Sequence, residues 1–156
     1  MMHSRMFSSR PLLVLVLVVL AAGSGCIGTA TPTRTPPYSQ TDLQIGAGDE
    51  AVIGMVVSVN YTGWLHEDSR PDAKGAVFDS SLGGNPFRFQ LGSGGVIAGW
   101  ERGVPGMRVG GIRRLVVPPS LAYGAPRTDV LPPYAALLFE IELLSVSTEA
   151  SGAQHR

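Results

Sequence analysis

Cysteine and histidine are scarce in this chain of 156 residues, and their positions exclude several kinds of chemistry. Cys26 is the only cysteine, so the chain cannot form a disulfide within itself. The three histidines, His3, His66 and His155, lie near the N-terminus, in a charged connecting segment and near the C-terminus. They form no cluster with zinc-site spacing, and none is placed as the base of a nucleophile. We therefore expect neither a metal nor another cofactor.

An excess of positive charge is also missing. The twelve Lys and Arg residues balance the twelve Asp and Glu residues. Removing residues 1–25 takes away Arg5 and Arg10 and no acid, which leaves ten basic and twelve acidic residues, a net charge of −2. Binding to nucleic acid or to an anionic membrane surface depends on basic patches. The charge therefore predicts no nucleic-acid partner.

The chain lacks an apolar run long enough to cross a membrane. Residues 12–22 are an unbroken apolar run of 11 residues, whereas a spanning helix needs about 20. The run follows two arginines and precedes the small residues Gly23, Ser24 and Gly25, which is the pattern of a secretory signal. We predict a signal peptide over residues 1–25 and an exported protein.

Cys26 directly follows this segment and has two interpretations. It is either an unmodified cysteine left after ordinary signal cleavage or the lipid-modified first residue of a bacterial lipoprotein. Ser24 and Gly25 resemble a lipobox, whereas Gly23 stands where that motif usually has leucine. Residues 26–42 are rich in Thr and Pro, which is typical of an extended tether. We favour lipidation of Cys26 and attachment to a bacterial membrane facing the periplasm or the cell exterior, with plain secretion as the alternative.

Residues 43–147 have the pattern of one folded domain, and residues 148–156 are predicted to be a disordered tail. Short segments of period two alternate with Gly and Pro, as in Val57, Val59 and Tyr61. Strands are predicted over residues 56–65, 77–81, 87–91, 111–118 and 136–146, and the charged segment 66–76 is predicted to be an exposed connection. Only residues 96–104 have helical spacing. The pattern predicts an α+β domain in which an antiparallel sheet curls around one short helix.

Three further residues have unusual settings. Asp79 is a carboxylate in an apolar strand, and a buried acid must be hydrogen-bonded or paired, so it either fixes a strand through a tyrosine or arginine or serves a site. Tyr123 lies in a Gly/Pro-rich loop, where an aromatic residue more often serves a site. Phe78 and Asp79 are adjacent, so they point to opposite faces unless the strand bends or ends there.

Several segments together carry a family resemblance. VNYTGWL, VFDSS, PFRFQLGSGGVIAGWERGVPGMRVGGIRRLVVPPSLAYG and LPPYAALLFEIELL occur in order between about residues 52 and 146. They resemble the FKBP-type peptidyl-prolyl cis-trans isomerases. The resemblance implies a five- or six-stranded antiparallel β-sheet wrapped around one short α-helix. It also implies rotamase activity on proline-containing polypeptides and binding of macrolide inhibitors of the rapamycin type.

The resemblance also implies a proline pocket between helix and sheet. Catalytic roles fall to Tyr61, Phe78, Asp79 and Tyr123. The substrate-binding residues are Phe87, Val96, Ile97, Trp100, Val130, Leu131 and Phe139. Trp100 would be the pocket floor, Ile97 would offer its backbone N–H and Tyr123 its hydroxyl, and Val130 and Leu131 would form the apolar tip of a covering loop.

The glycines near Trp100 have expected roles as well. Gly94 and Gly95 would form a turn, Gly99 would keep the helix slim where the sheet crosses it, and Gly103 would end the helix.

The sequence also departs from the family pattern. The segment 82–85 is short and lacks the arginine that often pairs with the aspartate, so Asp79 is expected to rely on Tyr61 alone. The loop 124–133 is about one residue short.

The alternative to an isomerase is an FKBP-like binding or chaperone module with little turnover; a small-molecule carrier ranks behind both. Because the whole set of pocket residues is present, we favour the enzyme.

Overall fold

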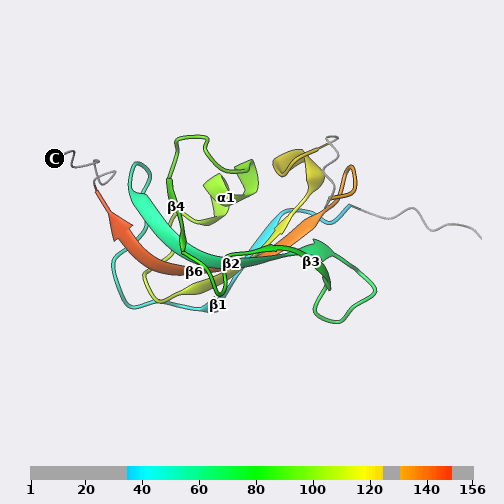
Figure 1. Ribbon diagram of the computed structural model, residues 1–156, viewed down its shortest axis with the longest axis horizontal. Coiled ribbons are helices and arrows are strands. Elements are labelled where there is room, and N and C mark those ends of the chain that lie inside the picture. Colours follow the sequence, from blue (N-terminus) through cyan, green and yellow to red (C-terminus); the bar gives the residue numbers. More distant parts are fainter. Residues whose placement is uncertain (1–34, 125–130, 149–156) are drawn as a thin grey trace, which may run out of the picture. The chain divides into compact units, whose positions relative to one another are not determined.

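Six strands of the described residues, 35–124 and 131–148, form one antiparallel sheet in the computed structural model (Figure 1). The strands are β1 (Ser39–Gln44), β2 (Val56–His66), β3 (Lys74–Ser80), β4 (Phe87–Gln90), β5 (Ile112–Val117) and β6 (Leu137–Ser147). One α-helix, α1 (Ala98–Gly103), and a 3₁₀ turn, η1 (Pro119–Leu121), complete the regular structure of these residues. The predicted α+β fold is confirmed.

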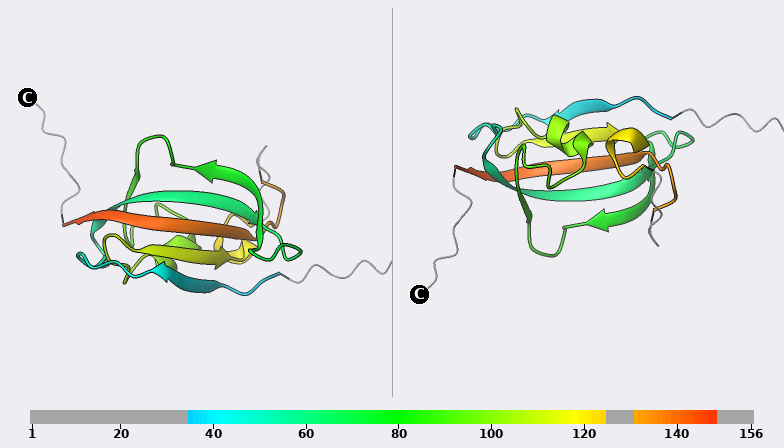
Figure 2. Two further views of the ribbon diagram at one scale, coloured as in Figure 1. Left: turned by 90° about the horizontal axis from the view of Figure 1, so that it is seen from below. Right: turned by 90° about the horizontal axis from the view of Figure 1, so that it is seen from above.

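The sheet has the strand order β1-β5-β6-β2-β3, and β4 also pairs with β2. β4 pairs with Val56–Val59 and β3 pairs with Thr62–His66, so the two short strands share one edge of β2. Figure 2 shows this order from β3 and β4 at one edge to β1 at the other. The sheet curves, and α1 and η1 lie on its concave face (Figure 1).

The core lies between α1 and this concave face. It includes Val57, Val59, Phe89, Leu91, Trp100, Val104, Leu115, Val117, Phe139, Ile141 and Leu143. In β5 and β6 the buried residues alternate as the period of two predicts. Leu138, predicted on the opposite side of β6, is also buried, at 1% exposure.

Two glycines allow α1 to lie directly on β5. A Cβ atom on Gly99 would be 2.5 Å from Cγ1 of Val117, and one on Gly103 would be 2.5 Å from Cδ2 of Leu115. Four helical residues advance about 6 Å and two strand residues about 6.6 Å, so the two pairs of contacts match in spacing. The expected slim helix at Gly99 is confirmed, and Gly103 packs against the sheet as well as ending the helix.

The predicted boundary between tether and domain is wrong at its C-terminal end. Residues 39–42 were assigned to the tether, but they belong to β1, which pairs with β5 from Ser39↔Val116 to Gln44↔Ile112. Every residue of β1 is exposed, so this strand is formed by backbone pairing and has no apolar alternation to reveal it. The predicted signal peptide and residues 26–34 lie outside the described residues.

The connection after β2 is shorter than predicted. β2 continues to His66, and β3 already begins at Lys74, so the exposed connection is Glu67–Ala73. No helix within residues 35–124 and 131–148 has the length and hydropathy needed to span a bilayer.

Asp42 should make the stability of the domain depend on acid pH. Hydrogen bonding from Arg113 holds the pKa of Asp42 below its usual value. A lowered folded-state pKa contributes stability above the unfolded pKa of about 3.9, and this contribution is lost as the pH falls through the folded value. Asp42→Asn should therefore lower the free energy of unfolding at pH 7, and this loss should shrink steadily as the pH falls below about 4. Urea unfolding at pH 7 and at a series of lower pH values measures this, and a loss that does not change with pH would contradict it.

Candidate active site

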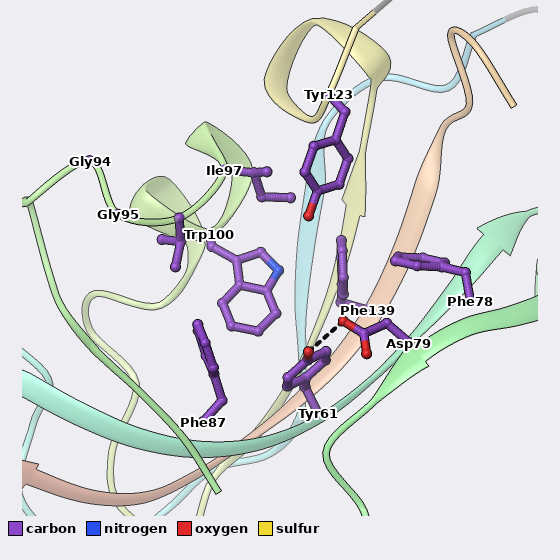
Figure 3. A pocket seen from close by; sticks show the side chains of 11 residues that line it. Tyr61, Phe78, Asp79, Phe87, Gly94, Gly95, Ile97, Trp100, Tyr123 and Phe139 are labelled. Carbon is purple, nitrogen blue, oxygen red and sulfur yellow. Dashed lines mark hydrogen bonds between the residues drawn. The ribbon is translucent and has the colours of Figure 1, made fainter. Parts of the chain in front are cut away.

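A pocket of about 440 Å³ opens between α1, the turn after η1 and the concave face of the sheet (Figure 3). Its lining residues are Tyr61, Phe78, Asp79, Phe87, Gly94, Gly95, Val96, Ile97, Trp100, Tyr123 and Phe139. The structure thus brings together nine of the eleven predicted site residues, and Gly94 and Gly95 complete the wall. Their roles in binding and catalysis remain predictions.

Leu131, a further predicted site residue, does not line this pocket. Leu131 was expected at the apolar tip of a covering loop, but it is 8% exposed and belongs to the core. Val130 and Cys26 lie outside the described residues. The described residues also contain no group of three His, Cys, Asp or Glu side chains that could hold a metal ion.

Trp100 forms the floor of the pocket and is held by four aromatic rings. The indole is 4% exposed. Its ring centroid lies 5.0 Å from Tyr61, 5.3 Å from Phe139, 5.7 Å from Phe89 and 6.0 Å from Phe87. Three of these contacts are edge-to-face, an arrangement that favours aromatic pairs. The floor is therefore fixed before any ligand binds.

The indole Nε1 is buried and has no hydrogen-bond acceptor among the described residues. In Figure 3 the nitrogen lies on the side of the indole that is turned towards Phe139, whose ring is nearly perpendicular to it at 87°. The nitrogen therefore lies beside the Phe139 ring without a hydrogen bond among the described residues.

Tyr61 and Asp79 are joined by a short hydrogen bond on one side of the pocket. The Tyr61 hydroxyl donates to Oδ2 of Asp79 over 2.6 Å, a length typical of a charge-assisted bond. Burial, together with this bond, raises the pKa of Tyr61 well above its ordinary value, so the phenol stays neutral across the physiological range. The predicted contact of Asp79 with Tyr61 is present, and among the described residues no other side chain hydrogen-bonds to Asp79. The expectation that Asp79 is buried is wrong, since it is exposed.

A bulge in β3 lets Phe78 and Asp79 face the same pocket. Gly63 pairs with Asp79 and Trp64 pairs with Val77, so Phe78 is an extra residue without a partner on β2. Such a bulge bends the strand and redirects side chains. A Cβ atom on Gly63 would lie 2.7 Å from Cζ of Phe78, so only glycine leaves room for the ring there. The bend that the sequence required for both residues to reach one site is present.

Glu101 holds the loop that forms the wall beside α1, and sequence analysis did not identify it. Its two carboxylate oxygens accept hydrogen bonds from the backbone N–H of Gly92 over 2.6 Å and of Gly94 over 2.9 Å. Gly94 has a φ of +73°, which suits glycine. The sequence does contain a signal for this role, because Glu101 lies in the first turn of a helix that follows a Gly-rich segment. Glu101 therefore fixes the turn that leads to Val96.

Glu101→Gln should loosen this wall. A glutamine amide has only one accepting oxygen, so one backbone N–H would face an NH₂ group. Because hydrogen bonds to charged groups contribute about 1.5–3 kcal/mol, we expect a loss of about 1–2 kcal/mol in the free energy of unfolding and a raised KM for a proline peptide. Urea unfolding and steady-state kinetics measure both. Glu142→Gln is the matched control, because Glu142 alternates with core residues of β6 and has no ion pair among the described residues. Equal behaviour of the two variants would refute the assignment.

Two hydrogen-bond donors at the pocket have no acceptor among the described residues. The Tyr123 hydroxyl points into the pocket in Figure 3, and burial is the main cause that raises the pKa of Tyr123, followed by the charge of Asp79. The backbone N–H of Ile97 directly precedes α1, where the first N–H groups of a helix lack partners within it. Both donors remain available to a ligand carbonyl.

Residues 48–144 match the profile of the FKBP-type peptidyl-prolyl cis-trans isomerase family. An FK506-binding protein of Neisseria meningitidis serogroup B is 48% identical over 107 residues, which cover 67% of this chain and 92% of that protein. A 46 kDa FK506-binding nuclear protein of Spodoptera frugiperda is 43% identical over 106 residues, 67% of this chain and 24% of that protein.

A solved structure agrees with these sequence matches. The crystal structure of a peptidyl-prolyl cis-trans isomerase from Pseudomonas syringae has a TM-score of 0.58 and 39% identity, and the match covers 70% of this chain and 75% of that one. Sequence and fold agree, and this chain belongs to the FKBP-type peptidyl-prolyl cis-trans isomerases.

Proposed function

We propose that the aromatic pocket above Trp100 accelerates X-Pro isomerisation in exported proteins by non-covalent binding alone. The observation that carries this proposal is the combination in one pocket of an apolar aromatic floor with neutral hydroxyl and backbone N–H donors at its edge. This combination can bind a proline ring and hydrogen-bond the adjacent carbonyl.

The chemistry of the peptide bond explains why such a pocket suffices. Rotation about C–N has a barrier of about 18–20 kcal/mol because resonance gives the bond partial double character. Uncatalysed X-Pro isomerisation takes about 10–100 s. The twisted transition state has lost this resonance and much of the amide dipole. A site that binds the twisted form more tightly than either planar form lowers the barrier without a nucleophile, a general base or a metal.

The lining residues divide into two groups in this proposal. Trp100, Phe87 and Phe139 surround the proline ring. Ile97 and Tyr123 donate to the substrate carbonyl, and Asp79 orients the Tyr61 hydroxyl through their 2.6 Å bond. Raised pKa values keep both tyrosines protonated at neutral pH. The rate should therefore be nearly constant between about pH 6 and 9, since no lining tyrosine titrates there.

The test is cis-to-trans conversion of a short X-Pro peptide by the full-length chain, with and without a macrolide of the rapamycin type. Members of the family bind proline-containing peptides and FK506-type ligands, so we expect acceleration that the macrolide inhibits. Tight macrolide binding without acceleration would instead identify a binding or chaperone module. If the protein neither accelerates the conversion nor binds the macrolide, the assignment of the pocket is refuted.

We also propose that the protein is exported and attached to a bacterial membrane through lipidated Cys26. The support is the apolar run of residues 12–22, followed by small residues and a single cysteine. Cys26→Ser should release the protein into the soluble fraction. If Cys26→Ser fractionates as the parent does, plain secretion is the better explanation.

A further inference from the structure

Tyr38, Asp42 and Arg113 join the N-terminal part of the domain to helix α1. The Tyr38 hydroxyl donates to the backbone oxygen of Gly99 over 3.2 Å. The Arg113 guanidinium donates to the backbone oxygen of Gly103 over 2.8 Å, and Asp42 accepts from it over 2.6 and 3.1 Å. We call these three residues the junction clamp, and none of them lines the pocket.

Arg113 is the only buried charged residue among those the structure describes, at 8% exposure. A buried guanidinium must be paired and hydrogen-bonded to be tolerated. Arg113 meets both needs, since Asp42 neutralises it and the C-terminal carbonyl of α1 accepts from it, at the helix end that favours a cation. Breaking the link from β1 to α1 would therefore leave a buried charge unpaired and destabilise the domain.

Helix α1 depends on such contacts for its position. It has six residues and no side-chain hydrogen bond at its N-cap, and helices shorter than about 12 residues are marginal on their own. The glycine face of α1 lies on Val117 and Leu115, and the junction clamp holds it at Gly99 and Gly103. These are the two helix residues that flank the turn carrying Trp100.

Trp100 directly follows Gly99, so any shift of the helix moves the pocket floor. The indole keeps its place among four rings at centroid distances of 5.0 to 6.0 Å. Such edge-to-face contacts depend on geometry. A misplacement of about 1 Å in a reacting geometry can reduce a rate by about 100-fold.

We propose that the junction clamp is a positioning element of the isomerase site, which sets the place of Trp100 through Gly99 and Gly103. Strand β1 and the residue before it then belong to the working enzyme, although sequence analysis assigned most of them to a tether. The kinetic consequence rests on the proposed function of the pocket, whereas the consequence for Trp100 does not.

The test compares Tyr38→Phe and Arg113→Gln with the parent in the full-length chain. A Trp64→Phe background leaves Trp100 as the only tryptophan, so acrylamide quenching and near-UV circular dichroism report its surroundings alone. We expect greater quenching of Trp100 in both variants and a fall in kcat of about three- to tenfold, with a smaller change in KM. Arg114→Gln is the matched control, because Arg114 is the next residue of β5 and its guanidinium pairs with Glu140 over 2.7 Å, with no hydrogen bond to α1 among the described residues.

Each outcome decides the matter. If Tyr38→Phe folds and its Trp100 signal and kcat equal those of the parent, the proposal is overturned. The same holds if Arg114→Gln changes both readouts as much as Arg113→Gln does. Should Arg113→Gln fail to fold, Tyr38→Phe alone decides, because it removes one oxygen and leaves the ion pair intact. If the parent protein has no isomerase activity, the proposed function is refuted. Acrylamide quenching of Trp100 would still test whether the junction clamp positions this residue.

Discussion

Phe78→Ala should reduce kcat/KM by at least about tenfold, which corresponds to about 1.4 kcal/mol of transition-state binding, while circular dichroism stays native. Phe78 is a wall of the pocket and contacts Phe139 edge-to-face, with ring centroids 5.6 Å apart. Removing the ring opens the pocket to water and weakens the apolar environment that disfavours the planar amide. Because Phe78 is only partly buried, we expect a smaller loss of stability than the 3–5 kcal/mol of a core Phe→Ala change.

Two matched variants separate this effect from a disturbance of β3. Val77→Ala changes the preceding residue, which is 58% exposed and does not line the pocket, so its kcat/KM should equal that of the parent. Phe78→Leu retains apolar volume and should recover part of the activity. Peptide isomerisation at several substrate concentrations measures kcat/KM for the three variants. Full activity in Phe78→Ala would contradict the proposed role of Phe78 as a wall of the pocket.

Gly99→Ala should damage both stability and activity, although it adds a single methyl group. The new Cβ would lie 2.5 Å from Cγ1 of Val117, so α1 must move away from β5. Overpacking of this kind costs about 1–3 kcal/mol, and the displaced helix carries Trp100 with it. We expect a lower free energy of unfolding together with a fall of at least about tenfold in kcat/KM.

A second substitution can test this explanation of Gly99→Ala. Val117→Ala removes the atoms that clash, so the double variant should be more stable than the sum of the two single effects by about 1 kcal/mol or more. Gly84→Ala is the matched control, because the nearest atom to its added Cβ is 3.6 Å away and the site has room. Simple additivity of Gly99→Ala and Val117→Ala would contradict a direct contact between helix and strand.

The sequence was sufficient for those parts of the protein that depend on apolar pattern and motif. Alternation in β2, β4 and β6 predicted strands that the structure places at nearly the same residues. Helical spacing around Trp100, with glycines at 99 and 103, predicted a slim helix against a sheet. Nine predicted residues meet in one pocket because the motifs lie on elements that converge there.

The sequence was insufficient where long-range polar contacts decide the structure. β1 is exposed along its whole length, so its pairing with β5 leaves no apolar pattern. The ion pair of Asp42 with Arg113 joins residues 71 positions apart, and neither residue type indicates its partner. The exposure of Asp79 follows from a bulge at Phe78, which depends on the register between β2 and β3.

Titration of a Trp64→Phe protein with an X-Pro peptide tests the central claim most directly, because its only tryptophan is the proposed floor of the proline pocket. We predict a saturable change in Trp100 emission, abolished by the macrolide, with a midpoint that equals the peptide concentration giving half-maximal isomerisation. Saturable isomerisation with no change in Trp100 emission would place the reaction elsewhere and contradict the account.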